Sequence, residues 1–133
     1  MPKIDSKALL QAANGARKFS VAKHSGFKVG AALLTGDGRI ITGANVESDS
    51  YGLTCCAERV ALFKSLTEGH REILAVAVVA RTAGGPMPCG ACRQLLVEYA
   101  PNAPLWVADS LRLGRARRFY MSDLLAHPFV LRS

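Results

Sequence analysis

Residues 73–80 read ILAVAVVA, an uninterrupted apolar run that is rich in β-branched side chains. A strand that shows one face to water alternates apolar and polar residues, whereas a strand covered on both faces does not. The run therefore predicts a central strand with structure packed on both of its sides.

A helix is expected on either side of this strand in the sequence. Residues 55–67 carry apolar side chains at helical spacing and end at Gly69, so Cys56 lies at a helix start. Downstream, the Gly/Pro-rich stretch 82–87 leads to Pro88, a residue suited to opening a helix, and residues 90–99 continue with their apolar side chains largely on one side. Two helix starts bearing cysteines are thus predicted beside neighbouring strands.

The rest of the chain completes an α/β pattern. The turn sequence TGDG at 35–38 joins two β-compatible runs in a predicted hairpin. The other expected elements are helices at 6–18 and 121–126 and strands at 27–34, 39–44, 104–108 and 116–120. Helices between apolar strands predict a three-layer α/β/α sandwich around a mixed five-stranded sheet. Such sheets bind ligands at strand ends, close to the expected positions of the cysteines.

Composition limits the classes of protein to consider. The chain has 133 residues, half of them apolar, which suits a single domain spanning residues 1–133. No apolar signal region or membrane-length apolar run is present, so we expect a soluble cytoplasmic protein without a membrane partner. The net charge of +7 concentrates only at Arg112, Arg115, Arg117 and Arg118. This cluster is either a solvated face or subunit contact, or a site that meets an anion. It does not indicate a nucleic-acid partner, because no aromatic and basic strand-binding groove accompanies it.

The four cysteines favour metal chemistry. Cys89 and Cys92 are three residues apart at a helix start, and Cys56 can supply a third thiolate from the other helix. Three protein ligands leave one position of a zinc ion open, which is typical of a catalytic site because a bound water becomes more acidic there. Cys55 is expected to be a small buried side chain, with exchange as a ligand as the alternative.

Two charged residues follow Cys56. Glu58 is close enough to reach the open position and is the candidate proton shuttle; alternatively, it only complements the helix dipole. Arg59 lies one turn beyond Cys56 and can donate hydrogen bonds to the sulfurs, offsetting their charge, or it is an exposed helix arginine. Among the histidines, His24 either lines a pocket or packs, and His70 is expected in solvent.

The segments CAER at 56–59 and PCGACRQ at 88–94 resemble the zinc signature of the cytidine deaminases. The similarity extends upstream to Phe27 and covers most of the chain to about Tyr99. The length matches the small homotetrameric branch of that family. The resemblance implies one Zn²⁺ per subunit and hydrolytic deamination of cytidine and 2′-deoxycytidine in pyrimidine salvage.

The same resemblance assigns roles to individual residues. It implies that Asn45 and Glu47 hold the ribose, that Phe27 packs on the pyrimidine, and that the backbone at Ala57 and near Pro88 reads the base edge. Glu58 would hold the ring nitrogen N3.

Three further points come from comparing the chain with that pattern. Phe129 resembles a C-terminal phenylalanine that reaches a neighbouring subunit's site. His24 stands where the family commonly has Tyr, and Ala44 where it commonly has Cys. The first departure bears on the sugar side of the pocket, and so on substrate preference.

Two other functions are compatible with these residues. One is deamination of another small aminated heterocycle, such as blasticidin S or a modified cytosine nucleoside. The other is a structural zinc module without turnover, in which Cys55 completes a closed four-sulfur site. Glu58 has no role in the second reading.

Overall fold

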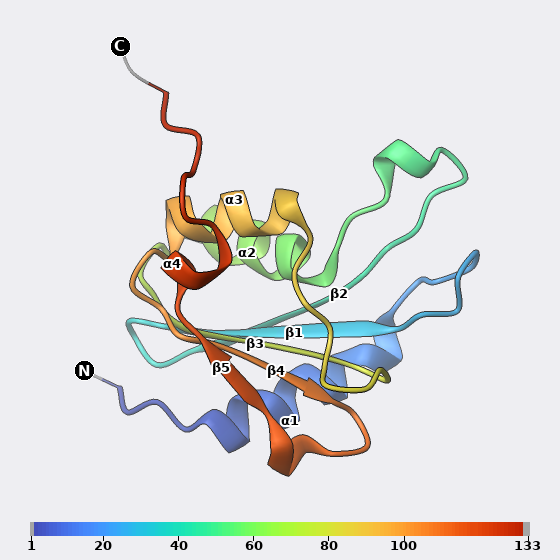
Figure 1. The fold of residues 1–133 in the computed structure, drawn as a ribbon, viewed down its shortest axis with the longest axis horizontal. Coiled ribbons are helices and arrows are strands. Elements are labelled where there is room, and N and C mark those ends of the chain that lie inside the picture. Colours follow the sequence, from blue (N-terminus) through green and yellow to red (C-terminus); the bar gives the residue numbers. More distant parts are fainter. Residues whose placement is uncertain (1, 132–133) are drawn as a thin grey trace.

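The computed structural model describes residues 2–131, which form a mixed five-stranded sheet with helices on both faces (Figure 1). The strands are β1 (Val29–Thr35), β2 (Ile40–Ala44), β3 (Ile73–Ala80), β4 (Leu105–Asp109) and β5 (Arg117–Phe119). The helices are α1 (Ser6–Ala16), α2 (Ala57–Thr67), α3 (Gly90–Tyr99) and α4 (Met121–Leu124), with short 3₁₀ turns η1 (Arg17–Phe19), η2 (Tyr51–Leu53) and η3 (Leu113–Arg115).

The strand order is β2-β1-β3-β4-β5, so β3 is the middle strand, as its sequence predicts. Only β3 and β4 run parallel, because α3 connects them as a crossover helix, whereas the other neighbouring pairs are antiparallel. Helix α1 covers one face, and α2, α3 and α4 lie on the other (Figure 1). The predicted three-layer sandwich is confirmed.

Alternate residues of β3 face two separate cores. Val76 and Val78 belong to the cluster beneath α2 and α3, whereas Ala75, Ala77 and Val79 belong to the cluster beneath α1. All five are buried, and burying a valine side chain stabilises the fold by roughly 1.5–3 kcal/mol. This two-sided burial explains the absence of polar residues from the strand.

Two glycines let helices lie directly on the sheet backbone. A Cβ at Gly30 would stand 1.9 Å from the carbonyl oxygen of Ala13 in α1. A Cβ at Gly43 would stand 2.5 Å from the backbone nitrogen of Ala61 in α2. No side chain fits between helix and strand at either contact, so the sheet backbone itself fixes how closely α1 and α2 approach.

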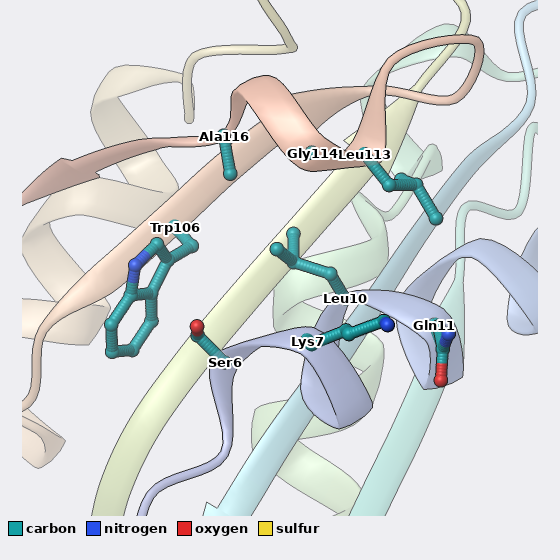
Figure 2. Close-up of a pocket in the computed structure, with 8 residues that line it drawn as sticks. All are labelled: Ser6, Lys7, Leu10, Gln11, Trp106, Leu113, Gly114 and Ala116. Atoms are coloured by element: carbon teal, nitrogen blue, oxygen red, sulfur yellow. The ribbon is translucent and has the colours of Figure 1, made fainter.

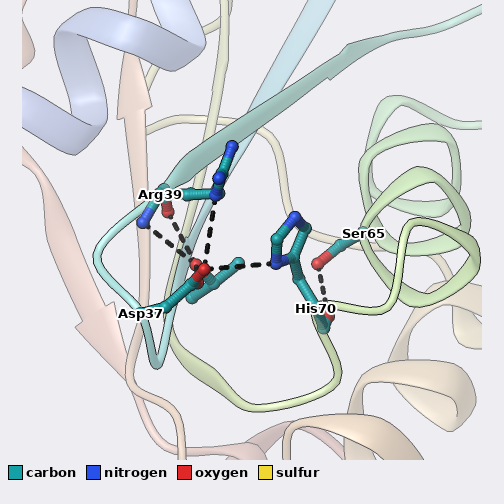
Figure 3. A network of polar contacts seen from close by, with 5 residues as sticks. Asp37, Arg39, Ser65 and His70 are labelled. Carbon is teal, nitrogen blue, oxygen red and sulfur yellow. Dashed lines mark hydrogen bonds and ion pairs between the residues drawn. The ribbon is translucent and has the colours of Figure 1, made fainter.

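A polar network closes the turn between β1 and β2 (Figure 3). The Thr35 hydroxyl donates to Asp37 and is the main cause that holds the pKa of that carboxyl below its usual range. Arg39 and His70 also contact this carboxylate, at 3.3 and 3.4 Å. The expectation that His70 lies in solvent is wrong. The chain after α2 returns against the turn, where the His70 carbonyl accepts from the buried Ser65 hydroxyl at 2.7 Å.

Within residues 2–131, no helix combines the length and the apolar character needed to cross a bilayer.

Candidate active site

Val46 joins the two chain segments that surround the site. Its backbone exchanges hydrogen bonds with Cys55 at 3.0 and 2.9 Å, and on the other side Val21 donates to the Asn45 carbonyl at 2.9 Å. These bridges place the polar segment 45–47 beside the start of α2. The sheet brings α3 alongside, because α3 leaves the end of the central strand through the 82–88 loop.

The sulfur atoms of Cys56, Cys89 and Cys92 meet at the starts of α2 and α3. All three Sγ atoms lie within 4.8 Å of one another, with Cys56 to Cys89 at 3.8 Å and Cys89 to Cys92 at 3.5 Å. Tetrahedral ligands at a Zn–S distance of about 2.3 Å are about 3.8 Å apart, so this donor set fits zinc. Cys55 is not in the group. The spacing of the cysteines predicted this grouping, and a four-sulfur site is not what the fold builds.

Both helices begin at a cysteine whose side chain does not cap the helix. The first-turn N–H groups therefore have no side-chain acceptor, and the positive ends of both helix dipoles lie at the end where the sulfurs meet. Hydrogen bonding from Cys92, assisted by Arg59, lowers the pKa of the Cys56 thiol to about 5. The same contact with the Cys56 thiolate raises the pKa of Cys92. The cluster therefore favours a thiolate at Cys56 and a thiol at Cys92, and a dication bound there would displace the thiol proton.

Arg59 lies beside the sulfurs, as expected, and is not an exposed helix arginine. One guanidinium nitrogen donates to Cys56 Sγ at 3.6 Å and to the Thr54 carbonyl at 3.2 Å. Hydrogen bonding with the Cys56 sulfur raises the pKa of Arg59 further above its ordinary value. Three thiolates and a dication would carry one net negative charge, which this guanidinium would balance.

Glu58 is the carboxylate of the site. It is 5% exposed, and burial raises its pKa to about 6. A cation held by the neighbouring sulfurs would oppose that shift. Glu58 lines a cavity of about 220 Å³ at the start of α2, which two of the clustered cysteines also line. The lining residues are Phe27, Val29, Asn45, Thr54, Cys55, Cys56, Ala57, Glu58, Val78, Pro86, Met87 and Cys89.

Three of the five residues expected to hold substrate line this cavity: Phe27, Asn45 and Ala57. Phe27 is 41% exposed and lines the cavity, and the backbone of buried Ala57 forms part of its wall. The Asn45 amide donates to the Phe27 carbonyl at 2.8 Å and accepts from Val29 N–H at 3.0 Å. Glu47 is outside the lining set. It accepts from the backbone N–H groups of His24 and Ser25 at 2.8 and 3.0 Å, and hydrogen bonding from the Ser25 hydroxyl is the main cause that lowers its pKa.

Pro88 is buried and does not line the cavity. Its carbonyl accepts a hydrogen bond from Arg93 Nε at 2.8 Å, and Arg93 also donates to the Leu124 carbonyl at 3.0 Å. The segment before Cys89 is therefore tied to the C-terminal part of the chain.

Phe129 lies away from the cavity of its own chain. Gln94 holds its backbone by two hydrogen bonds, donating to the Phe129 carbonyl at 2.9 Å and accepting from its N–H at 3.0 Å. Phe129 as a whole is 68% exposed. Gln94 belongs to the cysteine-bearing segment, yet its sequence position gave no sign of this contact, because its partner is 35 residues away.

Other cavity residues were missed by sequence reasoning. Pro86 and Met87 form one wall, and their position immediately before the Pro88–Cys89 pair was the available signal. Cys55, Val29 and Val78 contribute apolar surface, but nothing in their sequence pattern distinguishes them from core residues.

A larger cavity lies on the opposite face of the sheet, between α1 and η3 (Figure 2). Its volume is about 450 Å³, and its lining residues are Ser6, Lys7, Leu10, Gln11, Trp106, Leu113, Gly114 and Ala116. This set contains no thiol, imidazole or carboxylate, so it lacks the usual metal ligands, and Lys7 is its one titratable side chain. The smaller cavity is the candidate active site.

Known proteins share this architecture and sequence. Residues 2–107 match the family model described as the cytidine and deoxycytidylate deaminase zinc-binding region. The chain belongs to this deaminase family. A cytidine deaminase of Halalkalibacterium halodurans is 52% identical over 96% of both chains. A cytidine deaminase of Sporosarcina psychrophila is 46% identical over 80% of this chain and 79% of its own.

The fold agrees with this assignment. The crystal structure of cytidine deaminase from Burkholderia pseudomallei matches with a TM-score of 0.89 and 45% identity, covering 95% of this chain and all of that one. Family membership makes the protein a hydrolytic deaminase, and the resemblance seen in its two cysteine segments is confirmed.

Proposed function

We propose that this deaminase converts cytidine and 2′-deoxycytidine to uridine and 2′-deoxyuridine, consuming water and releasing ammonia. The observation that carries the proposal is the buried Glu58 carboxylate, which shares one cavity with a cluster of three sulfurs. A structural zinc module would have no use for a carboxylate at that position. We also propose that residues 1–133 act as a single catalytic domain.

We propose Cys56, Cys89 and Cys92 as ligands of one Zn²⁺ per chain. The sulfur separations and the two uncapped helix starts support this assignment. When bound, zinc would make a water molecule acidic enough to attack C4 of the pyrimidine near neutral pH. Arg59 would keep the thiolates hydrogen-bonded and balance the net negative charge of the site.

Glu58 would move the protons of the reaction. As a carboxylate it would accept a proton from the attacking water and deliver it to the ring nitrogen N3, so that C4 becomes tetrahedral. It would then help a proton reach the exocyclic amine, which leaves as ammonia while the C4 carbonyl forms. Burial favours this role because it raises the carboxyl pKa toward the working pH.

The nucleoside has possible partners around the cavity. Phe27 offers a ring face to the pyrimidine, and Ala57 offers a first-turn N–H of α2 to its carbonyl. Asn45 donates one of its two amide hydrogens to Phe27, which leaves the second for a ribose oxygen. A carboxylate has about four acceptor positions, so Glu47 can accept a ribose hydroxyl beside its three existing donors. The Pro88 carbonyl likewise has a second lone pair for the base edge.

We further propose a homo-oligomer, most simply a tetramer, in which Phe129 reaches a neighbouring subunit's site. Support comes from large apolar side chains that are strongly exposed in the single chain: Phe19, Tyr51, Leu53, Phe129 and Leu131. Exposed apolar side chains mark a surface that another protein covers where they gather into one patch. Light scattering would give the mass in solution, and an active monomer would overturn this part.

The reaction returns cytosine nucleosides to the uracil pool, so we place the protein in pyrimidine salvage. We place it in the cytoplasm, where thiolate ligands stay reduced.

The test is ultraviolet absorbance of zinc-loaded protein with cytidine, 2′-deoxycytidine, cytosine and blasticidin S, run beside Glu58→Gln. We expect loss of the cytidine band with release of ammonia, little turnover of cytosine, and a decrease in kcat of about 10²–10⁴-fold in the variant. Equal rates in both proteins would remove Glu58 from the mechanism. Turnover of blasticidin S without turnover of either nucleoside would overturn the proposed substrate, and His24 would then be the first residue to examine.

A further inference from the structure

The wall of the cavity formed by Pro86 and Met87 belongs to the loop between β3 and α3 (Figure 1). Among the described residues, neither backbone takes part in a hydrogen bond. The position of this wall therefore depends on how the loop is held at its two ends. At one end, Arg93 donates to the carbonyl of Pro88 at 2.8 Å.

At the other end, two glycines make a close approach to the sheet. Gly84 and Gly85 have φ values of +77° and +87°, a region that side-chain-bearing residues rarely adopt. A Cβ at Gly85 would stand 2.6 Å from the backbone nitrogen of Ala108, so the loop lies directly on β4. This turn is closed by a hydrogen bond from Gly85 N–H to the Thr82 carbonyl at 3.0 Å.

Arg117 on the edge strand β5 completes this anchor. Its Nε donates to the Gly84 carbonyl at 2.9 Å, and its guanidinium lies 5.3 Å from the centre of the Phe119 ring. Residues 117 and 119 share one face of the strand, and the ring restrains the arginine in the donating position. Arg117 pairs in register with Val107, whose side chain faces the α2 and α3 side of the sheet.

We propose that Arg117 is a positioning residue for substrate binding. It fixes the Gly84 carbonyl and thereby holds the Pro86–Met87 wall at the width that fits a pyrimidine nucleoside. The edge strand, which contributes nothing to the cavity lining, thus controls one side of it. Only the expected effect on KM for cytidine rests on the proposed function.

The chain offers a matched control on the same strand. Arg118 is the next residue, is also exposed, and pairs with Trp106 on the opposite face of the sheet. Its guanidinium lies over the Tyr120 ring at 5.3 Å, so its chemistry resembles that of Arg117. Arg117→Met and Arg118→Met therefore remove the same charge, and only the first removes the hydrogen bond to the loop.

The experiment measures steady-state kinetics with cytidine, zinc content, and hydrogen–deuterium exchange of peptides covering residues 82–88. For Arg117→Met we expect a KM about threefold higher, kcat within about twofold, unchanged zinc content and faster exchange of the loop, since an exposed hydrogen bond has a modest net effect. Arg117→Lys, which can still reach a carbonyl with one donor, is expected to recover part of the KM change. Arg118→Met should match the parent protein.

Unchanged loop exchange and KM in Arg117→Met would overturn the proposal, as would equal changes in Arg118→Met. Faster exchange with an unchanged KM would limit Arg117 to a structural role and also overturn it. If the parent protein does not turn over cytidine, the proposed function fails, but loop exchange still tests the anchor, and unchanged exchange in Arg117→Met still refutes it.

Discussion

Helix α1 begins in a different way from helices α2 and α3. At the start of α1, the Asp5 carboxylate accepts from Ala8 N–H at 3.1 Å and caps the helix. At the starts of α2 and α3, Cys56 and Cys89 provide no side-chain cap, and both residues belong to the sulfur cluster. At the start of α1, a side chain of the chain itself satisfies a helix N–H group. At the starts of α2 and α3, the first-turn N–H groups are left for something that the chain binds.

This difference separates residues that serve stability from residues that serve chemistry. A helix start without a cap costs roughly 0.5–2 kcal/mol relative to a capped one. The molecule has this arrangement twice at one place, on the face opposite α1 (Figure 1). We call the uncapped starts of α2 and α3 the open starts and the capped start of α1 the closed start. Changes at the open starts should affect activity more than folding. Changes at the closed start should affect folding more than activity.

After Glu58→Gln, the largest effect is expected for Arg59→Gln at the open start of α2. The variant loses the charged donor to Cys56 and leaves the thiolates less balanced, so zinc affinity or kcat/KM should fall by about 10–100-fold. Chelator competition and initial rates measure the two quantities. Arg71→Gln, at an exposed arginine remote from the sulfurs, is the control. A loss of zinc affinity and kcat/KM in Arg59→Gln that is smaller than in the control would disprove a charge-balancing role for Arg59.

A moderate effect is expected for Asp5→Ala at the closed start of α1. Loss of the cap should lower the free energy of unfolding by about 1 kcal/mol. The melting temperature should fall by about 4 °C, with kcat and KM unchanged. Calorimetry at one fixed protein concentration measures this, because assembly makes melting concentration-dependent. Asp49→Ala, which removes exposed contacts with Lys23 and His24, should melt like the parent. A change in kinetics without a change in melting would contradict the comparison.

The smallest effect is expected at another internally satisfied site, the turn after β1. The pKa of Asp37 is lowered in the folded protein, chiefly by the Thr35 hydroxyl. The stabilisation from this carboxylate is therefore fully present above the unfolded pKa of about 3.9 and is lost as the pH falls through the lower folded value. Asp37→Asn should melt slightly below the parent near neutral pH, and the two curves should converge in acid once the pH lies below the folded pKa. A difference that grows in acid would reverse the sign and disprove the assignment.

Much of the fold was predictable from the sequence, because the signals were local. The apolar run Ile73–Ala80 and the helix Gly90–Tyr99 have the predicted bounds. The three clustered cysteines were also predictable, since two lie in one helical turn and the third lies at another helix start. The positions of Glu58 and Arg59 close to the sulfurs were predictable from their helical spacing after Cys56.

The features that the sequence did not reveal depend on contacts between distant segments. Gln94 holds Phe129 across 35 residues, and Arg117 holds Gly84 across 33. His70 was misplaced for the same reason, because its partner Asp37 lies on a turn far away in sequence. A hydrogen bond between such segments has no period or spacing in the chain, so only the folded arrangement identifies it.

The contact between Gly43 and Ala61 determines how accurately the site is built. Because α2 lies on the backbone of β2 with no side chain between them, its distance from the sheet does not depend on the volume of any core residue at that point. Cys56 lies directly before this helix and Glu58 lies in its first turn, so the backbone of the sheet also fixes the positions of these two residues. Ordinary substitutions in the core can accumulate without changing the alignment between the proposed metal ligand, the proposed acid–base group and the base they would serve.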